Sequence, residues 1–136
     1  MIICGIELKA NNALIALINS ENNNIEYIEH KQKKISIEDD ENMEHILKFS
    51  NHIKELITTY NIEKIAIKKR AKKGNFAGGA VTFKLEAIIQ LNGISPVEFV
   101  SSQALNKLQK KDEIKFPSKL NKYQEQAYLA AVFCSS

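Results

Sequence analysis

The hydrophobic residues of this chain change their spacing once, close to residue 40, and this change constrains the fold more than any other feature. Before it, runs rich in β-branched residues at 2–8 and 13–19, followed by a looser alternation at 25–37, predict three strands. The segments that separate them, KANN and SENNN, are typical of turns because asparagine tolerates left-handed backbone conformations. Three successive strands with short turns predict an antiparallel meander.

After residue 40, helices alternate with strands. Hydrophobic residues recur at steps of three and four over 43–60, which predicts an amphipathic helix closed by Asn61. We expect Asp39, Asp40 and Glu41 to cap its first turn instead of binding a metal, because consecutive carboxylates point in different directions. The other predicted elements are a strand at 64–68, a largely buried helix at 80–92 ended by Gly93, a strand at 96–100, and helices at 102–110 and 123–133.

This order of elements predicts the fold class. An antiparallel meander followed by β-α-β crossovers gives an α/β protein with a mixed five-stranded sheet and helices on both faces, which is the order of the ribonuclease-H-like fold. The length of 136 residues predicts one domain spanning 1–136. We expect Cys4 and Cys134, at opposite ends of the chain, to be isolated buried thiols. No apolar run approaches the roughly 20 residues that cross a bilayer, so we expect a cytoplasmic protein without a membrane partner.

Charge is distributed unevenly along the chain. Residues 61–90 contain seven Lys/Arg and two Glu, whereas residues 21–60 contain five Lys/Arg and nine Asp/Glu. The strand at 64–68 runs into a basic turn with three glycines, and such a turn suits a phosphate-rich partner, although a solvated basic loop is the alternative. The predicted nucleic-acid-binding residues are Lys68, Lys69, Arg70, Lys72, Lys73, Phe76 and Lys84, with Phe76 stacking on a base or wedging against it.

Other candidate chemistry is weaker. His45 and His52 lie two helical turns apart and can share a face, but no acid or cysteine completes a metal site, so exposed helix histidines are the expected outcome. The glycine turn GNFAGG lacks the spacing and the GK[ST] ending of a nucleotide-binding loop.

Three segments resemble known proteins. GIE at Gly5–Glu7 resembles the start of RuvC-type Holliday-junction resolvases, the block from Lys68 to Glu86 resembles their fourth strand and following helix, and YQEQAYLAAVF resembles their last helix. More closely, GIELK, KGNFAGGAVTFKLEA and YQEQA resemble an uncharacterised bacterial domain-of-unknown-function family of ribonuclease-H-like proteins. The resemblance covers residues 1 to about 133.

The resemblance implies a carboxylate site that can be compared with this chain. Nucleases of this fold hold two divalent metals with acids from the first strand, the end of the fourth strand and the last helix, and Mg²⁺ requires oxygen ligands. Glu7 occupies the first position, and Glu125 is acidic in the last helix, where Gln126 fits the register at least as well. Lys68, Lys69 and Arg70 stand where the strand-four acid belongs, and Glu86 is an alternative ligand.

Three functions follow from these features. The first is a nucleic-acid-binding protein of RuvC-like fold whose nuclease centre is degenerate, with Lys68 paired to Glu7. The second is a Mg²⁺-dependent nuclease or resolvase that uses Glu7, Glu125 and Glu86 as catalytic residues. The third is a homodimeric interaction module in which the acidic region of one copy meets the basic turn of another.

Overall fold

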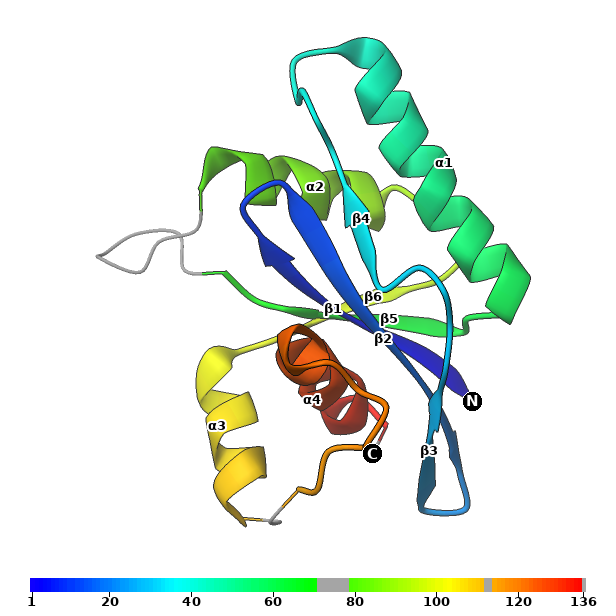
Figure 1. Ribbon diagram of the computed structural model, residues 1–136, viewed down its shortest axis with the longest axis vertical. Coiled ribbons are helices and arrows are strands. Elements are labelled where there is room, and N and C mark those ends of the chain that lie inside the picture. Colours follow the sequence, from blue (N-terminus) through cyan, green and yellow to red (C-terminus); the bar gives the residue numbers. More distant parts are fainter. Residues whose placement is uncertain (71–78, 112–113, 136) are drawn as a thin grey trace.

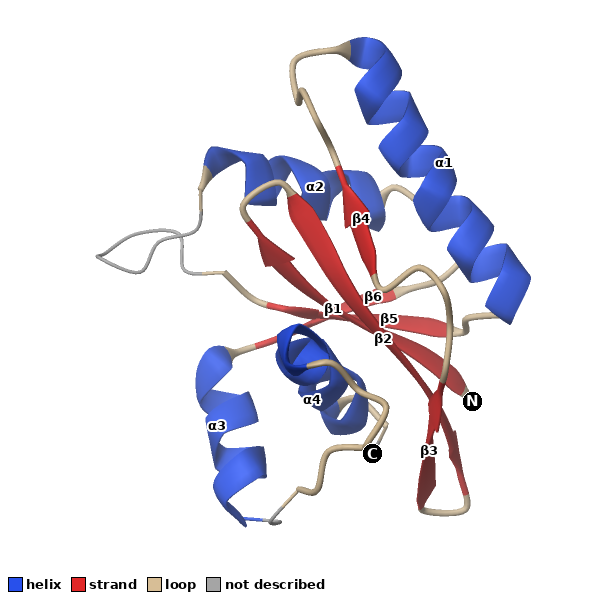
Figure 2. Ribbon diagram, in the orientation of Figure 1, coloured by secondary structure: helices blue, strands red, loops and turns tan. Residues whose placement is uncertain are grey.

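A computed structural model of the protein describes residues 1–70, 79–111 and 114–135. A twisted sheet forms the middle layer, with α1 and α2 on one face and α3 and α4 on the other (Figure 1; strands are red in Figure 2). The elements are β1 (Ile2–Lys9), β2 (Asn12–Glu21), β3 (Asn24–Ile28), β4 (Lys34–Ser36), α1 (Met43–Tyr60), β5 (Lys64–Lys68), α2 (Ala80–Gln90), β6 (Val97–Val100), α3 (Ser102–Lys111), the 3₁₀ turn η1 (Lys122–Gln124) and α4 (Glu125–Phe133).

The sheet has the strand order β3-β2-β1-β5-β6, and β4 pairs with β2 beside this path. β1 is antiparallel to β2 and parallel to β5, which in turn is parallel to β6, so the predicted meander and crossovers are confirmed. The number of strands differs from the prediction, because the structure has six strands and not five. The segment predicted as one strand at 25–37 divides into β3 and β4, which pair with opposite ends of β2.

Side chains that alternate along the central strands build two hydrophobic cores. Cys4, Ile6 and Leu8 of β1 point into the core shared with α1 and α2. Ile3, from the alternate positions of β1, points into the core beneath α3 and α4. The end of β1 on this second face carries Glu7 and Lys9, so the face changes from hydrophobic to polar along the strand.

Two details of the helices differ from the predictions. The N-cap of α1 is Asn42, whose side-chain oxygen accepts the N–H groups of Glu44 and His45, whereas Asp39 and Asp40 bond elsewhere. Asn61 closes α1 in a left-handed conformation, as predicted. The helix α2 is less buried than predicted: its buried residues are Thr82, Leu85 and Ile89, and Leu91 beyond its end is 80% exposed.

Both cysteines are free and buried, as predicted. Burial raises the pKa of the Cys4 thiol, and burial together with a hydrogen bond to Glu98 raises the pKa of Cys134 to about 12. Neither thiol is therefore an activated nucleophile. Within the part of the chain that the structure describes, no helix has the length and hydrophobicity that a membrane span needs.

Candidate functional site

The centre of the site forms where α4 lies directly against β1. A Cβ atom on Gly5 would lie 1.8 Å from the backbone oxygen of Ala127 and 3.0 Å from the Cβ atom of Ala131, so only glycine allows this approach. Glu7 points to the same face as Gly5, because side chains two residues apart on a strand share a face. The close packing at Gly5 therefore places Gln126, the neighbour of Ala127, beside Glu7.

Lys68, the last residue of β5, joins these two side chains. Its Nζ atom donates a hydrogen bond of 2.9 Å to Oε1 of Gln126 and lies 3.5 Å from Oε2 of Glu7. The side chains of Lys68 and Glu7 are only 17% and 13% exposed, so water screens this ion pair less than a pair on the surface. Glu7, Lys68 and Gln126 are called the central triad below.

The start of α4 is held in place by a buried glutamine. Nε2 of Gln124 donates to the backbone oxygen of Ile15 at 2.8 Å and to the hydroxyl of Tyr27 at 3.2 Å, and its Oε1 accepts the N–H of Asn121. The three polar residues of the YQEQA segment thus have different positions: Gln124 anchors the helix to β2, Gln126 belongs to the central triad, and Glu125 lies half-buried in the first turn of α4.

The central triad does not fit the two-metal centre that the fold implies. An ammonium group repels a metal ion and has no lone pair to offer it, and Lys68 places one between Glu7 and Gln126. Among the residues that the structure describes, no three His, Cys, Asp or Glu side chains lie together in a way that could hold a metal. Glu7, Glu86 and Glu125 are thus not gathered into one carboxylate cluster.

Glu86 lies in another place, at the basic end of β5. It lines a small pocket of about 310 Å³ together with Lys69, Arg70, Gln90 and Phe99. Lys69 is exposed and continues the pairing of β5 with β6 through a 2.7 Å hydrogen bond from its N–H to the oxygen of Val100. This arrangement puts two cations and one carboxylate in a pocket against α2, at the carboxyl end of β5.

The remaining residues predicted to bind nucleic acid fall into two groups. Lys84 on α2 is engaged within the chain, where its Nζ atom lies 3.1 Å from Oδ2 of Asp40 and 2.6 Å from the backbone oxygen of the same residue. Lys72, Lys73 and Phe76 lie outside the described residues. Lys68, which was also predicted to bind nucleic acid, is half-buried in the central triad. Its ammonium group already contacts Glu7 and Gln126.

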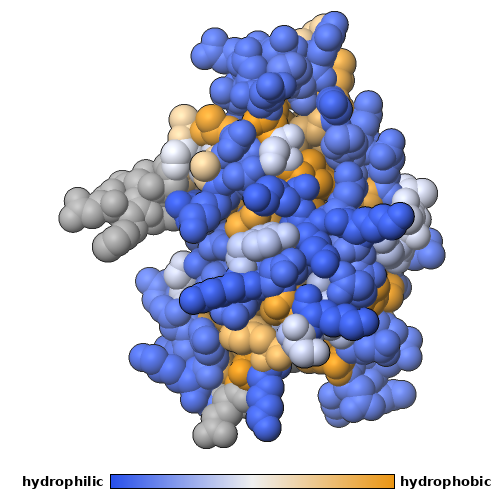
Figure 3. Space-filling model, in the orientation of Figure 1, coloured by the Kyte–Doolittle hydropathy of each residue, from blue (hydrophilic) through white to orange (hydrophobic). Residues whose placement is uncertain are grey.

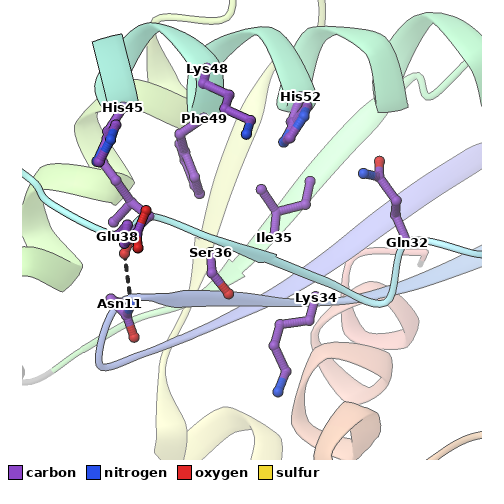
Figure 4. Close-up of a pocket in the computed structure, with 11 residues that line it drawn as sticks. Asn11, Gln32, Lys34, Ile35, Ser36, Glu38, His45, Lys48, Phe49 and His52 are labelled. Atoms are coloured by element: carbon purple, nitrogen blue, oxygen red, sulfur yellow. Dashed lines mark hydrogen bonds between the residues drawn. The ribbon is translucent and has the colours of Figure 1, made fainter. Parts of the chain in front are cut away.

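A second hollow of about 400 Å³ lies between α1 and β4 (Figure 4). His45, Lys48 and His52 project from α1 toward it, so the two histidines share a face as the spacing predicts. Nδ1 of His45 accepts the N–H of Asp39 at 3.1 Å, which assigns this nitrogen to a hydrogen bond within the chain. The hollow is separated from the central triad by the sheet, because the α1 side chains approach β4 from the opposite face.

Two residues of the site were not singled out from the sequence for the role they have. Gly5 carries the signal of a lone glycine inside a hydrophobic strand, which is typical of a close backbone approach. Gln124 gives no signal by itself, because a glutamine at a predicted helix start is more often solvated than buried.

Comparison with solved structures defines the class of fold. RuvC from Thermus thermophilus is similar with a TM-score of 0.70 and 9% identity, covering 98% of this chain and 92% of RuvC. The same protein in complex with a Holliday junction substrate gives a TM-score of 0.70, 9% identity and coverages of 98% and 91%. Fowlpox virus resolvase in complex with Holliday junction DNA gives a TM-score of 0.59, 15% identity and coverages of 99% and 97%. The protein therefore has a ribonuclease-H-like fold of the RuvC type, as its sequence predicts.

The family can be named as well. Residues 1–134 match the family described as "Protein of unknown function (DUF3010)", and the chain belongs to that family. This confirms the resemblance to a domain-of-unknown-function family. A comparison with curated proteins found no match.

Proposed function

We propose that this protein binds nucleic acid and that the central triad replaces the catalytic metal centre of its fold. The observation that carries the proposal is the position of Lys68 Nζ, 3.5 Å from Glu7 and 2.9 Å from Gln126. Two-metal cleavage of a phosphodiester needs several oxygen ligands around the ions, and this centre contributes one carboxylate that is already neutralised by an ammonium group.

The same ion pair makes the centre compatible with phosphate. Carboxylates without a bound cation repel a nucleic-acid backbone, whereas Glu7 paired with Lys68 presents no net charge. Lys69 and Arg70 follow directly on β5 and line a pocket with Glu86, so the end of this strand carries a net positive charge. Phosphates are attracted to such a surface without a divalent ion.

The comparisons support the choice of partner. The solved structures of the Thermus thermophilus and fowlpox virus resolvases include complexes with Holliday junctions, and both cover almost the whole of this chain. At identities of 9% and 15%, these structures indicate a shared fold and not a shared function. We therefore propose nucleic acid as the partner from the charge of the site together with that fold.

The experiment measures binding of fluorescent duplex, branched and single-stranded DNA and RNA by anisotropy, with EDTA or with Mg²⁺. We expect binding in EDTA at least as tight as in Mg²⁺, no cleavage, and a steep loss of affinity as salt rises. Lys69→Glu together with Arg70→Glu should weaken binding to every sequence by at least about tenfold, because two phosphate contacts become repulsive.

The matched control reverses two exposed charges on α1, Lys48→Glu with Lys54→Glu, and neither lysine lines the pocket at the end of β5 or belongs to the central triad. This variant has the same net charge as the test variant and should bind almost as well as the unchanged protein. Absence of binding to all of these probes would overturn the proposal. Mg²⁺- or Mn²⁺-dependent cleavage that disappears in Glu7→Ala would instead establish the nuclease alternative.

A further inference from the structure

The face of the sheet that carries the central triad is only partly covered by helices. In the pairing of β1, β2 and β4, Glu7 lies opposite Leu14, Lys9 opposite Asn12, and Leu14 opposite Lys34. These residues therefore share one face of the sheet. They lie around the turn between β1 and β2 and on the neighbouring β4. In the space-filling view, hydrophilic side chains cover most of the visible surface and hydrophobic ones appear between them as separate patches (Figure 3).

A groove of about 780 Å³ lies between this face and the segment that leads into α4. The strands contribute Glu7, Lys9, Asn12, Leu14 and Lys34, and the other wall is formed by Asn121, Lys122, Tyr123 and Gln126. Glu7 and Gln126 of the central triad are therefore part of its lining. Gln124 fixes the second wall, because its buried side chain holds the start of α4 against β2. The groove is thus built from anchored elements.

The lysines of this groove, unlike several others in the protein, form no ion pairs with carboxylates of the described residues. Lys33, Lys64 and Lys84 each form an ion pair with a carboxylate. Lys9, Lys34 and Lys122 form no ion pair with any residue that the structure describes. The Nζ atom of Lys34 lies 5.5 Å from the ring centroid of Tyr123, within the range of a cation–π contact that positions the ammonium group over the groove without neutralising it.

We infer that this groove binds a single strand of nucleic acid, with the backbone phosphates on Lys9, Lys34 and Lys122 and the strand passing over Glu7 and Gln126 of the central triad. The inference rests on the proposed function and assigns it a second surface and a substrate class. Three unpaired ammonium groups around one groove attract a chain of phosphates, and the neutralised Glu7 does not oppose it.

The size of the groove favours one strand over a duplex. Its volume lies within the range of sites for small organic molecules, which is enough for a few nucleotides. A duplex would rest across the opening and reach only the outermost lysines. Tyr123, which is 43% exposed, and the amides of Asn12 and Asn121 add an aromatic surface and hydrogen-bonding groups of the kind that contact unpaired nucleotides.

The test compares Lys9→Glu with Lys122→Glu against the control pair Lys48→Glu with Lys54→Glu. Both pairs reverse two exposed lysines, so the net charge of the two variants is the same. The probes are fluorescent single-stranded DNA and RNA and a duplex of the same length. We expect the groove variant to lose at least about tenfold in affinity for the single strands, a smaller factor for the duplex, and the control to lose little. Circular dichroism and thermal melting check that each variant is folded.

A second variant, Lys9→Gln with Lys122→Gln, removes the charges without introducing repulsion and should weaken single-strand binding in the same direction by a smaller factor. An excess of a mononucleotide at equal nucleotide concentration should not displace the strand, and displacement would assign the groove to a free nucleotide instead. Equal losses for single strand and duplex would overturn the assignment of substrate class.

The inference and the proposed function can fail separately. If Lys69→Glu with Arg70→Glu weakens binding but the groove variants bind like the control, nucleic-acid binding stands and the groove is not part of it. If the unchanged protein binds none of the probes, both are overturned.

Discussion

At the scale of single residues, the absence of one side chain decides where the site forms. Gly5 allows the backbone of α4 to touch β1, and the hydrogen bond between Lys68 and Gln126 depends on that approach. Any larger residue would push α4 away from the sheet, because the nearest atom is a backbone oxygen that cannot move by changing a rotamer.

We therefore predict that Gly5→Ala destabilises the protein by about 1–3 kcal/mol or more, as overpacking of a core does. Gly79→Ala is the matched control, because a Cβ at Gly79 meets no atom within 4 Å and its φ of −67° suits alanine. The free energy of unfolding in urea measures both effects. A Gly5→Ala protein as stable as the Gly79→Ala protein would contradict the close packing of α4 on β1.

At the scale of elements, three segments far apart in the sequence supply one side chain each. β1 contributes Glu7, the end of β5 contributes Lys68, and the first turn of α4 contributes Gln126. The parallel pairing of β1 with β5 brings the carboxyl ends of both strands to the same edge of the sheet, so the ion pair follows from the topology.

Removal of the charge of Lys68 should therefore weaken its contacts with both the sheet and α4, and so lower the stability of the folded protein. We predict that Lys68→Met destabilises by about 1–3 kcal/mol, since it leaves the half-buried carboxylate of Glu7 without its partner. Adding Glu7→Gln should recover part of the loss, because the uncompensated charge is then gone. Chemical denaturation of the four proteins of this double-mutant cycle gives the coupling energy.

Another lysine of β5 serves as the control for this cycle. Lys64 lies 3.6 Å from Glu98, but the two side chains are 27% and 55% exposed. Solvent screens this pair, so Lys64→Met should show little coupling with Glu98→Gln, whatever Lys64→Met loses through the hydrogen bond of Lys64 to the backbone oxygen of Cys134. Equal coupling in the two cycles would show that burial does not strengthen the pair in the central triad.

At the scale of the whole molecule, His30 connects the meander to the first helix. It lies in the link between β3 and β4, is 4% exposed, and its ring packs against Tyr27 and Tyr60. Nδ1 donates to the oxygen of Ile28 at 3.0 Å, which leaves Nε2 buried with no hydrogen-bond partner among the described residues. Burial lowers the pKa of His30, because the charged imidazolium is poorly solvated there.

This lowered pKa predicts how stability changes with pH. The unfolded chain takes up a proton at His30 at a higher pH than the folded protein does, so protons favour unfolding. The contribution of His30 to the free energy of unfolding is fully present above about pH 6.5, the ordinary pKa of histidine. This contribution is lost as the pH falls from there toward the lower pKa of His30 in the folded state.

Urea denaturation at a series of pH values between about 7.5 and 5.5 measures this dependence. His30→Asn keeps a side-chain N–H for the oxygen of Ile28. In this variant the free energy of unfolding should decrease less between about pH 7.5 and 5.5 than in the unchanged protein. His52→Asn, at a half-buried histidine of α1, is the control for the loss of one imidazole. The same slope in His30→Asn and in the unchanged protein would rule His30 out as the source.

Much of the fold could be predicted from the sequence. The strand at Lys64–Lys68 and the helix at Met43–Tyr60 have the predicted bounds, because hydrophobic period and local capping are properties of neighbouring residues. The division of 25–37 into β3 and β4 could not be predicted, since it depends on where each half pairs along β2. The cap at Asn42 also escaped prediction, because three acidic residues before it carry the same kind of signal.

The site divides in the same way. The sequence by itself determined that a lysine ends the predicted strand at 64–68, where the RuvC resemblance implies an acid, and that Glu7 and Gln126 are candidates for the same site. Only the tertiary structure decided that Lys68 reaches both, and that Lys9 of β1, Lys34 of β4, and Lys122 and Tyr123 of η1 line one groove. The physical reason is that period and propensity act between neighbours along the chain. Contacts between distant segments depend instead on strand register and on the close approach of α4 to Gly5.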